Sequence, residues 1–123
     1  MLLRRLLSQK EDRRRSPRLQ PEDVVAYYWT GGLPRPNAVS GIGPDGARIV
    51  APGVLYLGTV IQIVFEDRAA SRSHGVEGER ICVYGRVLRA VAGGFCVEFV
   101  FGGASERRRF RQFLHRLKQR NGG

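Results

Sequence analysis

The chain has 123 residues, of which 42% are hydrophobic and 26% charged, and its formal net charge is +10. This length suits one domain with one core and is too short for two, and the hydrophobic content excludes a chain that is disordered throughout. No apolar run is long enough to span a membrane, and segment 1–7 is too short and too interrupted by arginine to form a signal-peptide core, so the sequence predicts a cytoplasmic protein.

Basic side chains are concentrated at the two ends of the chain. Residues 1–18 hold seven basic and two acidic side chains, residues 105–120 hold seven and one, and the segment between them is nearly neutral. A nearly neutral body with two basic ends favours an anionic partner that the ends contact. Residues 1–12 are interpreted as a flexible segment or a short helix with four leucines on one side, because so short a helix is marginal alone.

The segment that follows is an arginine-rich arm. Pro17 stops a helix and favours extended backbone just before it. Arg13, Arg14 and Arg18 are therefore presented on an extended chain, where guanidinium groups can grip phosphates in pairs and stack on bases. Taken alone, the segment fits a solvated basic tail better than a binding site.

Five or six short strands come next. They are indicated by β-branched and aromatic residues, by alternating apolar and polar side chains, and by turns rich in glycine and proline. The predicted strands are 24–29, 37–42 (the weakest), 47–50, 59–65, 80–90 and 95–101. A Gly-Pro-Asp-Gly turn occupies 43–46, and the polar segment 66–79 is predicted to be a mobile loop.

The alternation also predicts which side chains fill the core. The residues expected to face inward are Ile61, Ile63, Phe65, Ile81, Val83, Val87, Phe95, Val97 and Phe99. The last segment is predicted to be a helix with Ser105 as its N-cap, one apolar stripe, and basic residues elsewhere. The stripe consists of Phe110, Phe113, Leu114 and Leu117.

The two cysteines are predicted to be free thiols. In the last hairpin, the inward pattern places Cys96 opposite Leu88 or Ala90. Cys82 then lies at the far end of the same ribbon, so a disulfide within the chain is not expected.

Short strands at hairpin spacings followed by one helix predict a mainly β protein, a small antiparallel barrel of about six strands with a C-terminal α-helix. A single domain is expected over 13–120, after the segment 1–12. It contains the arginine arm at 13–18, the barrel at 22–101 and the helix at 105–119.

Few residues are suited to catalysis. His74 lies in the polar loop and His115 on the last helix, and neither has a partner at the spacing of a triad or a metal site. Segment 41–46 spells G-x-G-x-x-G, but a strand follows it where a dinucleotide fingerprint needs a helix. The sequence therefore predicts a binding module rather than an enzyme, with no metal and no cofactor.

Several motifs, taken in order, resemble the PilZ family. R-R-x-x-x-R precedes the first strand, G-A-R-I follows the turn at 43–46, and then come G-x-V, V-x-F and a basic amphipathic helix. The resemblance covers roughly residues 10–118. It implies a PilZ-type barrel of about six strands whose outer surface binds cyclic di-GMP, a bacterial second messenger.

The resemblance also implies a set of site residues. In the family, paired arginines contact guanine and phosphate, and a D/N-x-S-x-x-G motif supplies hydrogen bonds to guanine. The ligand-binding residues implied by the match are Arg13, Arg14, Arg18, Gly41, Gly43 and Gly46. The arginines suit this ligand because guanine O6 and N7 form a double acceptor that a guanidinium fork matches.

Two positions depart from the family pattern. Its Asp or Asn is Gly41 here and its Ser is Gly43, and the loss of both hydrogen bonds would weaken binding by about 1–4 kcal/mol. The possible substitutes are Asn37, Ser40, Asp45 and Arg48. Two functions stay open, a cyclic di-GMP receptor and a degenerate domain that binds a protein partner instead. Nucleic-acid binding by the basic ends ranks third, and specific recognition is not expected because no aromatic residue interleaves the N-terminal arginines.

Overall fold

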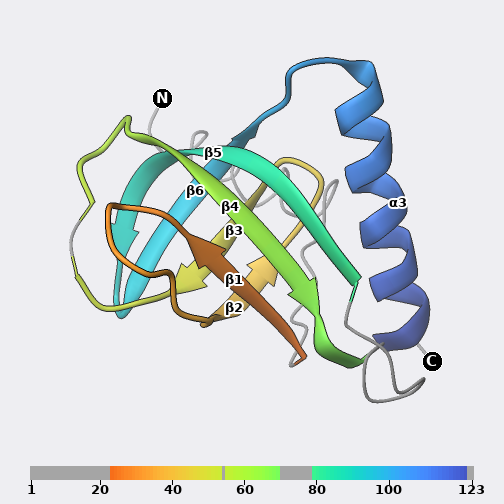
Figure 1. Ribbon diagram of the computed structural model, residues 1–123, viewed down its shortest axis with the longest axis horizontal. Helices are drawn as coiled ribbons and strands as arrows, with labels where there is room; N and C mark the ends of the chain where they lie inside the picture. The colour runs from red at the N-terminus through yellow and green to blue at the C-terminus, as the bar shows by residue number, and fades with distance from the viewer. Residues whose placement is uncertain (1–22, 54, 70–78, 122–123) are drawn as a thin grey trace, which may run out of the picture.

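The computed structural model describes residues 23–53, 55–69 and 79–121, so residues 1–12 and the arginine arm lie outside the described residues. Within these ranges, strands of one barrel precede a C-terminal helix (Figure 1). The elements are β1 Val24–Tyr28, β2 Asn37–Ile42, β3 Gly46–Val50, β4 Val60–Asp67, β5 Glu79–Val91, β6 Gly94–Val100 and α3 Ala104–Asn121. Every predicted strand is present, with its ends shifted by two residues at most.

The strands close into one antiparallel barrel in the order β1-β2-β3-β6-β5-β4. Four of the six seams join strands that follow each other in the chain. The other two join distant strands, with Tyr28 of β1 opposite Ile63 of β4 and Ala47 of β3 opposite Val97 of β6. The predicted fold, a six-stranded antiparallel barrel with a C-terminal helix, is confirmed.

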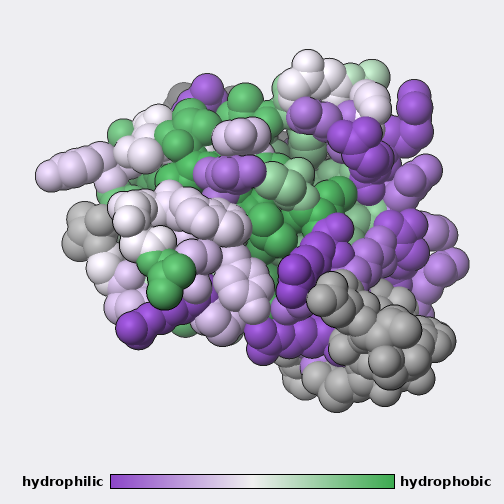
Figure 2. Space-filling view, in the orientation of Figure 1, coloured by the Kyte–Doolittle hydropathy of each residue, from purple (hydrophilic) through white to green (hydrophobic). Residues whose placement is uncertain are grey.

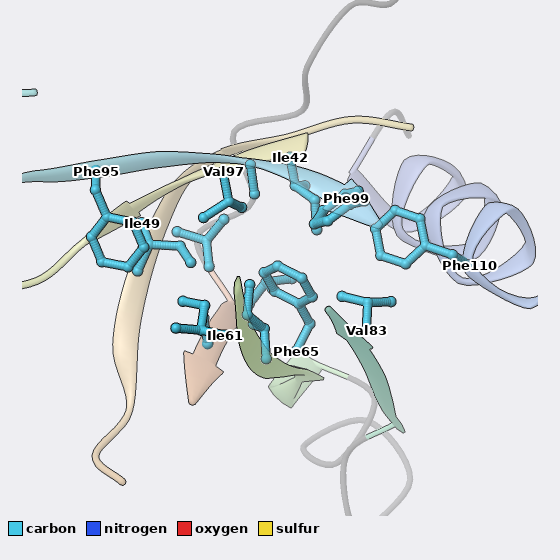
Figure 3. Close-up of a cluster of buried hydrophobic side chains, with 14 of the residues drawn as sticks. Ile42, Ile49, Ile61, Phe65, Val83, Phe95, Val97, Phe99 and Phe110 are labelled. Atoms are coloured by element: carbon cyan, nitrogen blue, oxygen red, sulfur yellow. The ribbon is translucent and has the colours of Figure 1, made fainter. Parts of the chain in front are cut away.

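The predicted inward side chains fill the barrel (Figure 3). Ile63 and Phe65 of β4 have no exposed surface, and Val97 of β6 is 1% exposed. Phe65 meets Phe99 edge to face across the barrel, with ring centroids 5.9 Å apart, which is a favoured geometry for two aromatic rings. The outward residues of the same strands are mostly polar or at least partly exposed, and Cys96 of β6 is an exception because it is 1% exposed.

Helix α3 packs along one end of the barrel through its predicted apolar stripe (Figure 1). Phe110 is fully buried and its ring lies 4.6 Å from that of Phe99. The helix begins at Ala104, one residue before the predicted N-cap, and Glu106 accepts a hydrogen bond from the Gly102 N–H at 2.6 Å. That bond satisfies a donor at the helix N-terminus, where a carboxylate is also favoured by the helix dipole. Among the described residues, no helix has the length and apolar character needed to cross a membrane.

The β5–β6 hairpin corrects the predicted position of Cys96. A bulge at Leu88 shifts the register, so Cys96 lies opposite Arg89 rather than opposite Leu88 or Ala90. Sequence alternation cannot reveal one extra residue in a strand, because such a residue changes the pairing without changing the composition. Cys82 and Cys96 are free thiols, as predicted.

The predicted loop 66–79 was wrong at its ends. Glu66 and Asp67 extend β4 and are 6% and 1% exposed, while Glu79 begins β5. The ladder continues to the pair Asp67–Glu79. Two acidic residues in succession favour a loop by composition, but nearby arginines and backbone donors allow them to be buried in this strand.

Candidate functional site

The β2–β3 hairpin gathers most of the predicted site residues. It carries Ser40, Gly41, Gly43, Asp45, Gly46 and Arg48. The predicted turn is present, with the Gly43 N–H donating to the Gly46 carbonyl oxygen at 2.9 Å. The Phe99 N–H donates to the Asp45 carbonyl oxygen at 2.8 Å, so the turn is also fastened to β6. The hairpin therefore has a fixed position on the barrel.

A bulge in β2 sets the direction of the side chains near the turn. Val39 lies opposite Ile49 and Gly41 lies opposite Arg48, which leaves Ser40 as the extra residue. Directly opposed residues of an antiparallel pair point to the same face. Arg48 is exposed on the outer face, so a side chain at position 41 would stand beside it. Gly41 has none and is buried, as is Gly43.

Gly46 is required by packing. A Cβ at this position would lie 2.2 Å from the carbonyl oxygen of Val97, far inside the closest normal contact of about 3.0 Å. The two strands approach so closely at the start of β3 that no larger residue fits without moving backbone. The match of Gly46 to the last glycine of the family motif is thus explained by the fold.

The possible substitutes are placed differently from one another. Ser40 is exposed beside the turn, and its Oγ donates to the Arg48 carbonyl oxygen over a long 3.5 Å. Asp45 is exposed at the turn itself. Asn37 lies at the opposite end of β2, about 16 Å along the strand from Ile42, which precedes the turn. Its Nδ2 donates to the carbonyl oxygens of Ala26 and Arg35, so this amide fastens the start of β2.

The outer face of the hairpin carries one exposed arginine, Arg48, and one exposed acid, Asp45 at the turn. Arg48 has no carboxylate partner among the described residues. The nearest acid across the seam is Glu98, which lies opposite Gly46 and pairs with Arg86 of β5 at 3.4 Å. The negative charge of Glu98 is thus matched by Arg86 rather than by Arg48.

The arginine half of the predicted site is not described. Arg13, Arg14 and Arg18 lie outside the described residues, and their contact with the hairpin stays a prediction. The first described residue, Asp23, accepts a hydrogen bond at its carbonyl oxygen from the Arg68 N–H at 2.9 Å. This bond fixes the start of β1 at the end of β4.

A cluster of one acid, two arginines and a tyrosine joins β1, β4 and β5 and was not predicted from the sequence. Glu66 is nearly buried, and its two carboxylate oxygens accept hydrogen bonds from Nε of Arg68 and Nε of Arg80, each at 3.0 Å. Arg68 also donates to the Tyr27 hydroxyl oxygen at 2.7 Å. Burial alone raises the pKa of Glu66, but the hydrogen bonds and charges of the two arginines outweigh it and hold that pKa below its ordinary value. The cluster stabilises the seam between β1, β4 and β5.

A second cluster covers the outer side of α3. Arg108, Arg111, Gln112, His115 and Arg116 line a shallow hollow of about 550 Å³. Figure 2 shows hydrophilic side chains gathered along the helix edge of the molecule, next to the more apolar barrel surface. The run of arginines was visible in the sequence, but the hollow depends on how the helix is rotated against the barrel.

Comparisons with known proteins bear on the fold. No protein-family model matches the chain, and no curated protein matches it. Among solved structures, the Bacillus subtilis inhibitor of motility MotI/DgrA is similar with a TM-score of 0.62 and 15% identity. The match covers 89% of this chain and 52% of that one, so this chain spans about half the length of the Bacillus protein. An uncharacterized Legionella protein matches with a TM-score of 0.55 and 14% identity, over 86% of this chain and 98% of that one.

These likenesses are structural, since identities of 14–15% carry no residue-level correspondence. They establish that the barrel with its C-terminal helix is a known arrangement. Among the described residues, no group of three or more His, Cys, Asp or Glu side chains could hold a metal ion.

Proposed function

We propose that the chain is a PilZ-type receptor for cyclic di-GMP, which binds on the outer face of the β2–β3 hairpin. The observation that carries this proposal is the β2–β3 hairpin, which holds Gly41, Gly43 and Gly46, the positions matched to the D/N-x-S-x-x-G motif. Beside them lies Arg48, which is exposed and has no carboxylate partner among the described residues. The likeness to an inhibitor of motility supports the fold that this function requires.

The chemistry of the ligand suits these residues. Each guanine of cyclic di-GMP offers O6 and N7 as a double acceptor, and its two phosphates are anionic. Guanidinium forks match both groups, and their flat faces can stack on the bases. In the proposed complex, Arg13, Arg14 and Arg18 grip guanine and phosphate from one side, and Arg48 holds a phosphate oxygen from the barrel side.

Calorimetry tests the proposal directly. Titration of the protein with cyclic di-GMP should release heat, and GMP at the same concentration should not compete. Arg14→Ala with Arg18→Ala should abolish the signal, and Arg48→Gln should weaken binding about tenfold through loss of one charge-assisted hydrogen bond. Arg35→Gln with Arg89→Gln removes two exposed charges elsewhere and serves as the matched control.

A ligand that binds the folded state alone must also raise the melting temperature. Cyclic di-GMP at one hundred times its dissociation constant should stabilise the protein by about 2.7 kcal/mol. The absence of both heat and a thermal shift at millimolar ligand would refute the receptor function.

A degenerate domain that binds a protein partner is the second candidate, favoured by Gly41 and Gly43 and by apolar side chains on the barrel loops far from α3 (Figure 1). Leu33 is 94% exposed, Tyr56 84% and Leu57 66%. Exposed apolar residues of this kind are typical of protein interaction surfaces.

Restoring the family residues separates the two candidates. Gly41→Asp with Gly43→Ser would place a carboxylate beside Arg48 and return the missing hydrogen-bonding groups. If the double variant stays folded and binds cyclic di-GMP while the parent does not, the parent is degenerate. If the parent already binds, the receptor function holds.

A further inference from the structure

We propose that the outer side of α3 binds the phosphodiester backbone of nucleic acid without regard to sequence. The surface concerned, called here the α3 basic face, consists of Arg108, Arg111, Gln112, His115 and Arg116. This proposal is independent of cyclic di-GMP binding at the β2–β3 hairpin, because the two surfaces share no residue.

The α3 basic face is continuous along the helix. Each member has another member three or four residues further along or back, which puts all five on one side of two successive turns. From Arg108 to Arg116 the helix rises about 12 Å. The α3 basic face is therefore a row of hydrogen-bond donors that runs parallel to the helix axis and is long enough to contact successive phosphates.

Two arginines of the α3 basic face, Arg108 and Arg111, are available for a ligand, whereas the third, Arg116, pairs with Glu79 of β5. Arg108 and Arg111 are exposed, and neither pairs with a carboxylate among the described residues. Their neighbours on the helix are engaged differently, since Arg109 donates to the Ser105 hydroxyl and Arg107 lies over the ring of Phe101. The one acid of the helix, Glu106, is bonded to the backbone of Gly102. The positive charges of Arg108 and Arg111 are thus left without an acidic partner among the described residues.

The chemistry of the face favours nucleic acid over the other anionic partners. An amphipathic helix enters a membrane surface through its apolar side, but here Phe110, Phe113 and Leu117 are buried against the barrel. Protein interfaces combine arginine with large aromatic or apolar anchors at their centre, and the α3 basic face has no Trp, Tyr, Phe or aliphatic side chain to serve as one. Protein–nucleic acid interfaces are polar and strongly positive, and most of their hydrogen bonds go to phosphate and sugar.

Arginine rather than lysine dominates the helix, with six arginines and one lysine between residues 105 and 120. The planar guanidinium binds a phosphate through two parallel hydrogen bonds, which a lysine ammonium cannot do. The one aromatic side chain of the α3 basic face is His115, and stacking on it or on a guanidinium is open to any base, because every base has a flat π-face. Binding should therefore follow the backbone charge and ignore base identity.

Fluorescence anisotropy with a labelled 20-base mixed-sequence DNA, both as a single strand and as a duplex, tests the proposal. The full chain should bind both probes at 50 mM salt, and a second unrelated sequence should bind equally. On the duplex, the logarithm of the binding constant should fall linearly with the logarithm of salt concentration. Arg108→Gln with Arg111→Gln removes two phosphate contacts and should reduce that slope by about 1.8.

The control variant carries Arg35→Gln and Arg89→Gln, which removes the same charge from exposed positions on the barrel. Its salt slope should match that of the parent. The single variant Arg108→Gln should reduce the slope by about 0.9 and carries the same test if the double variant does not fold.

Three results would overturn the proposal. The parent could fail to bind either probe at 50 mM salt. The salt slope of the control variant could fall as much as that of the α3 variant, which would show that binding depends on net charge and not on the α3 basic face. The protein could bind vesicles of phosphatidylcholine with 30% phosphatidylglycerol in a manner that depends on Arg108 and Arg111 and yet not bind DNA.

Discussion

Replacing Gly46 by alanine should destabilise the barrel by about 3 kcal/mol. The added Cβ would begin 2.2 Å from the Val97 carbonyl oxygen, so β3 and β6 must separate until that distance reaches at least 3.0 Å. A movement of that size stretches the 2.8 Å bond from the Phe99 N–H to the Asp45 carbonyl oxygen to about 3.6 Å, which is outside hydrogen-bond range. The cost combines overpacking with the loss of that bond near the core.

Urea unfolding followed by circular dichroism measures this change. For a domain of this size, 3 kcal/mol corresponds to a fall of about 12 °C in melting temperature. Gly32→Ala is the matched control, because a Cβ at Gly32 meets nothing within 4 Å and its φ is not positive. It should leave stability unchanged or raise it by about 0.5 kcal/mol. A Gly46→Ala protein as stable as the Gly32→Ala protein would refute the close approach of β3 and β6.

Three further predictions concern the core and the ion pairs. Phe110→Ala should cost about 3–5 kcal/mol in urea unfolding because it leaves a cavity between α3 and the barrel, and a loss under 1 kcal/mol would contradict that packing. Glu66→Gln should cost about 2 kcal/mol at pH 7. Because the folded state holds the pKa of Glu66 below its ordinary value, this contribution is present at neutral pH and is lost as pH falls through the folded-state pKa. The difference in stability between the two proteins should therefore shrink on acidification, and a constant difference would contradict the linkage. Glu79→Gln removes the exposed pair with Arg116 and should cost less than about 1 kcal/mol, and a loss above 2 kcal/mol would show that this pair is structural.

The strands and the apolar stripe of the helix could be predicted because they depend on local patterns. Alternation along β4 and β6 identifies Ile63, Phe65 and Val97 as core residues without knowledge of their partners. Spacing along α3 identifies Phe110 and Leu117 in the same way. In each case the spacing of the hydrophobic residues predicts which side of the strand or helix is buried in the core.

The closure of the barrel could not be predicted in this way. The seams between β1 and β4 and between β3 and β6 join strands far apart in the chain, and no turn residue specifies them. The bulges at Ser40 and Leu88 are equally hidden, because each adds a residue without changing the pattern of composition. Glu66 was predicted to lie in a loop because it is charged. Its burial in β4 depends on an ion pair with Arg80 of β5, and local sequence does not show that the two residues meet.

The glycines of the candidate site carry different kinds of information. Gly46 is imposed by the Val97 carbonyl oxygen, so its agreement with the family motif supports the barrel and says nothing about a ligand. Gly41 lies opposite Arg48, so a side chain at position 41 would stand beside Arg48 and would bear on the proposed binding site. A change at Arg48 then tests whether the hairpin takes part in the proposed binding. If Arg48→Gln weakens cyclic di-GMP binding about tenfold, the hairpin holds the ligand without the family's acidic residue, because one guanidinium supplies the contact from the barrel side. If Arg48→Gln leaves binding unchanged while Arg14→Ala with Arg18→Ala abolishes it, the arm alone holds the ligand and the proposed role of the hairpin is wrong.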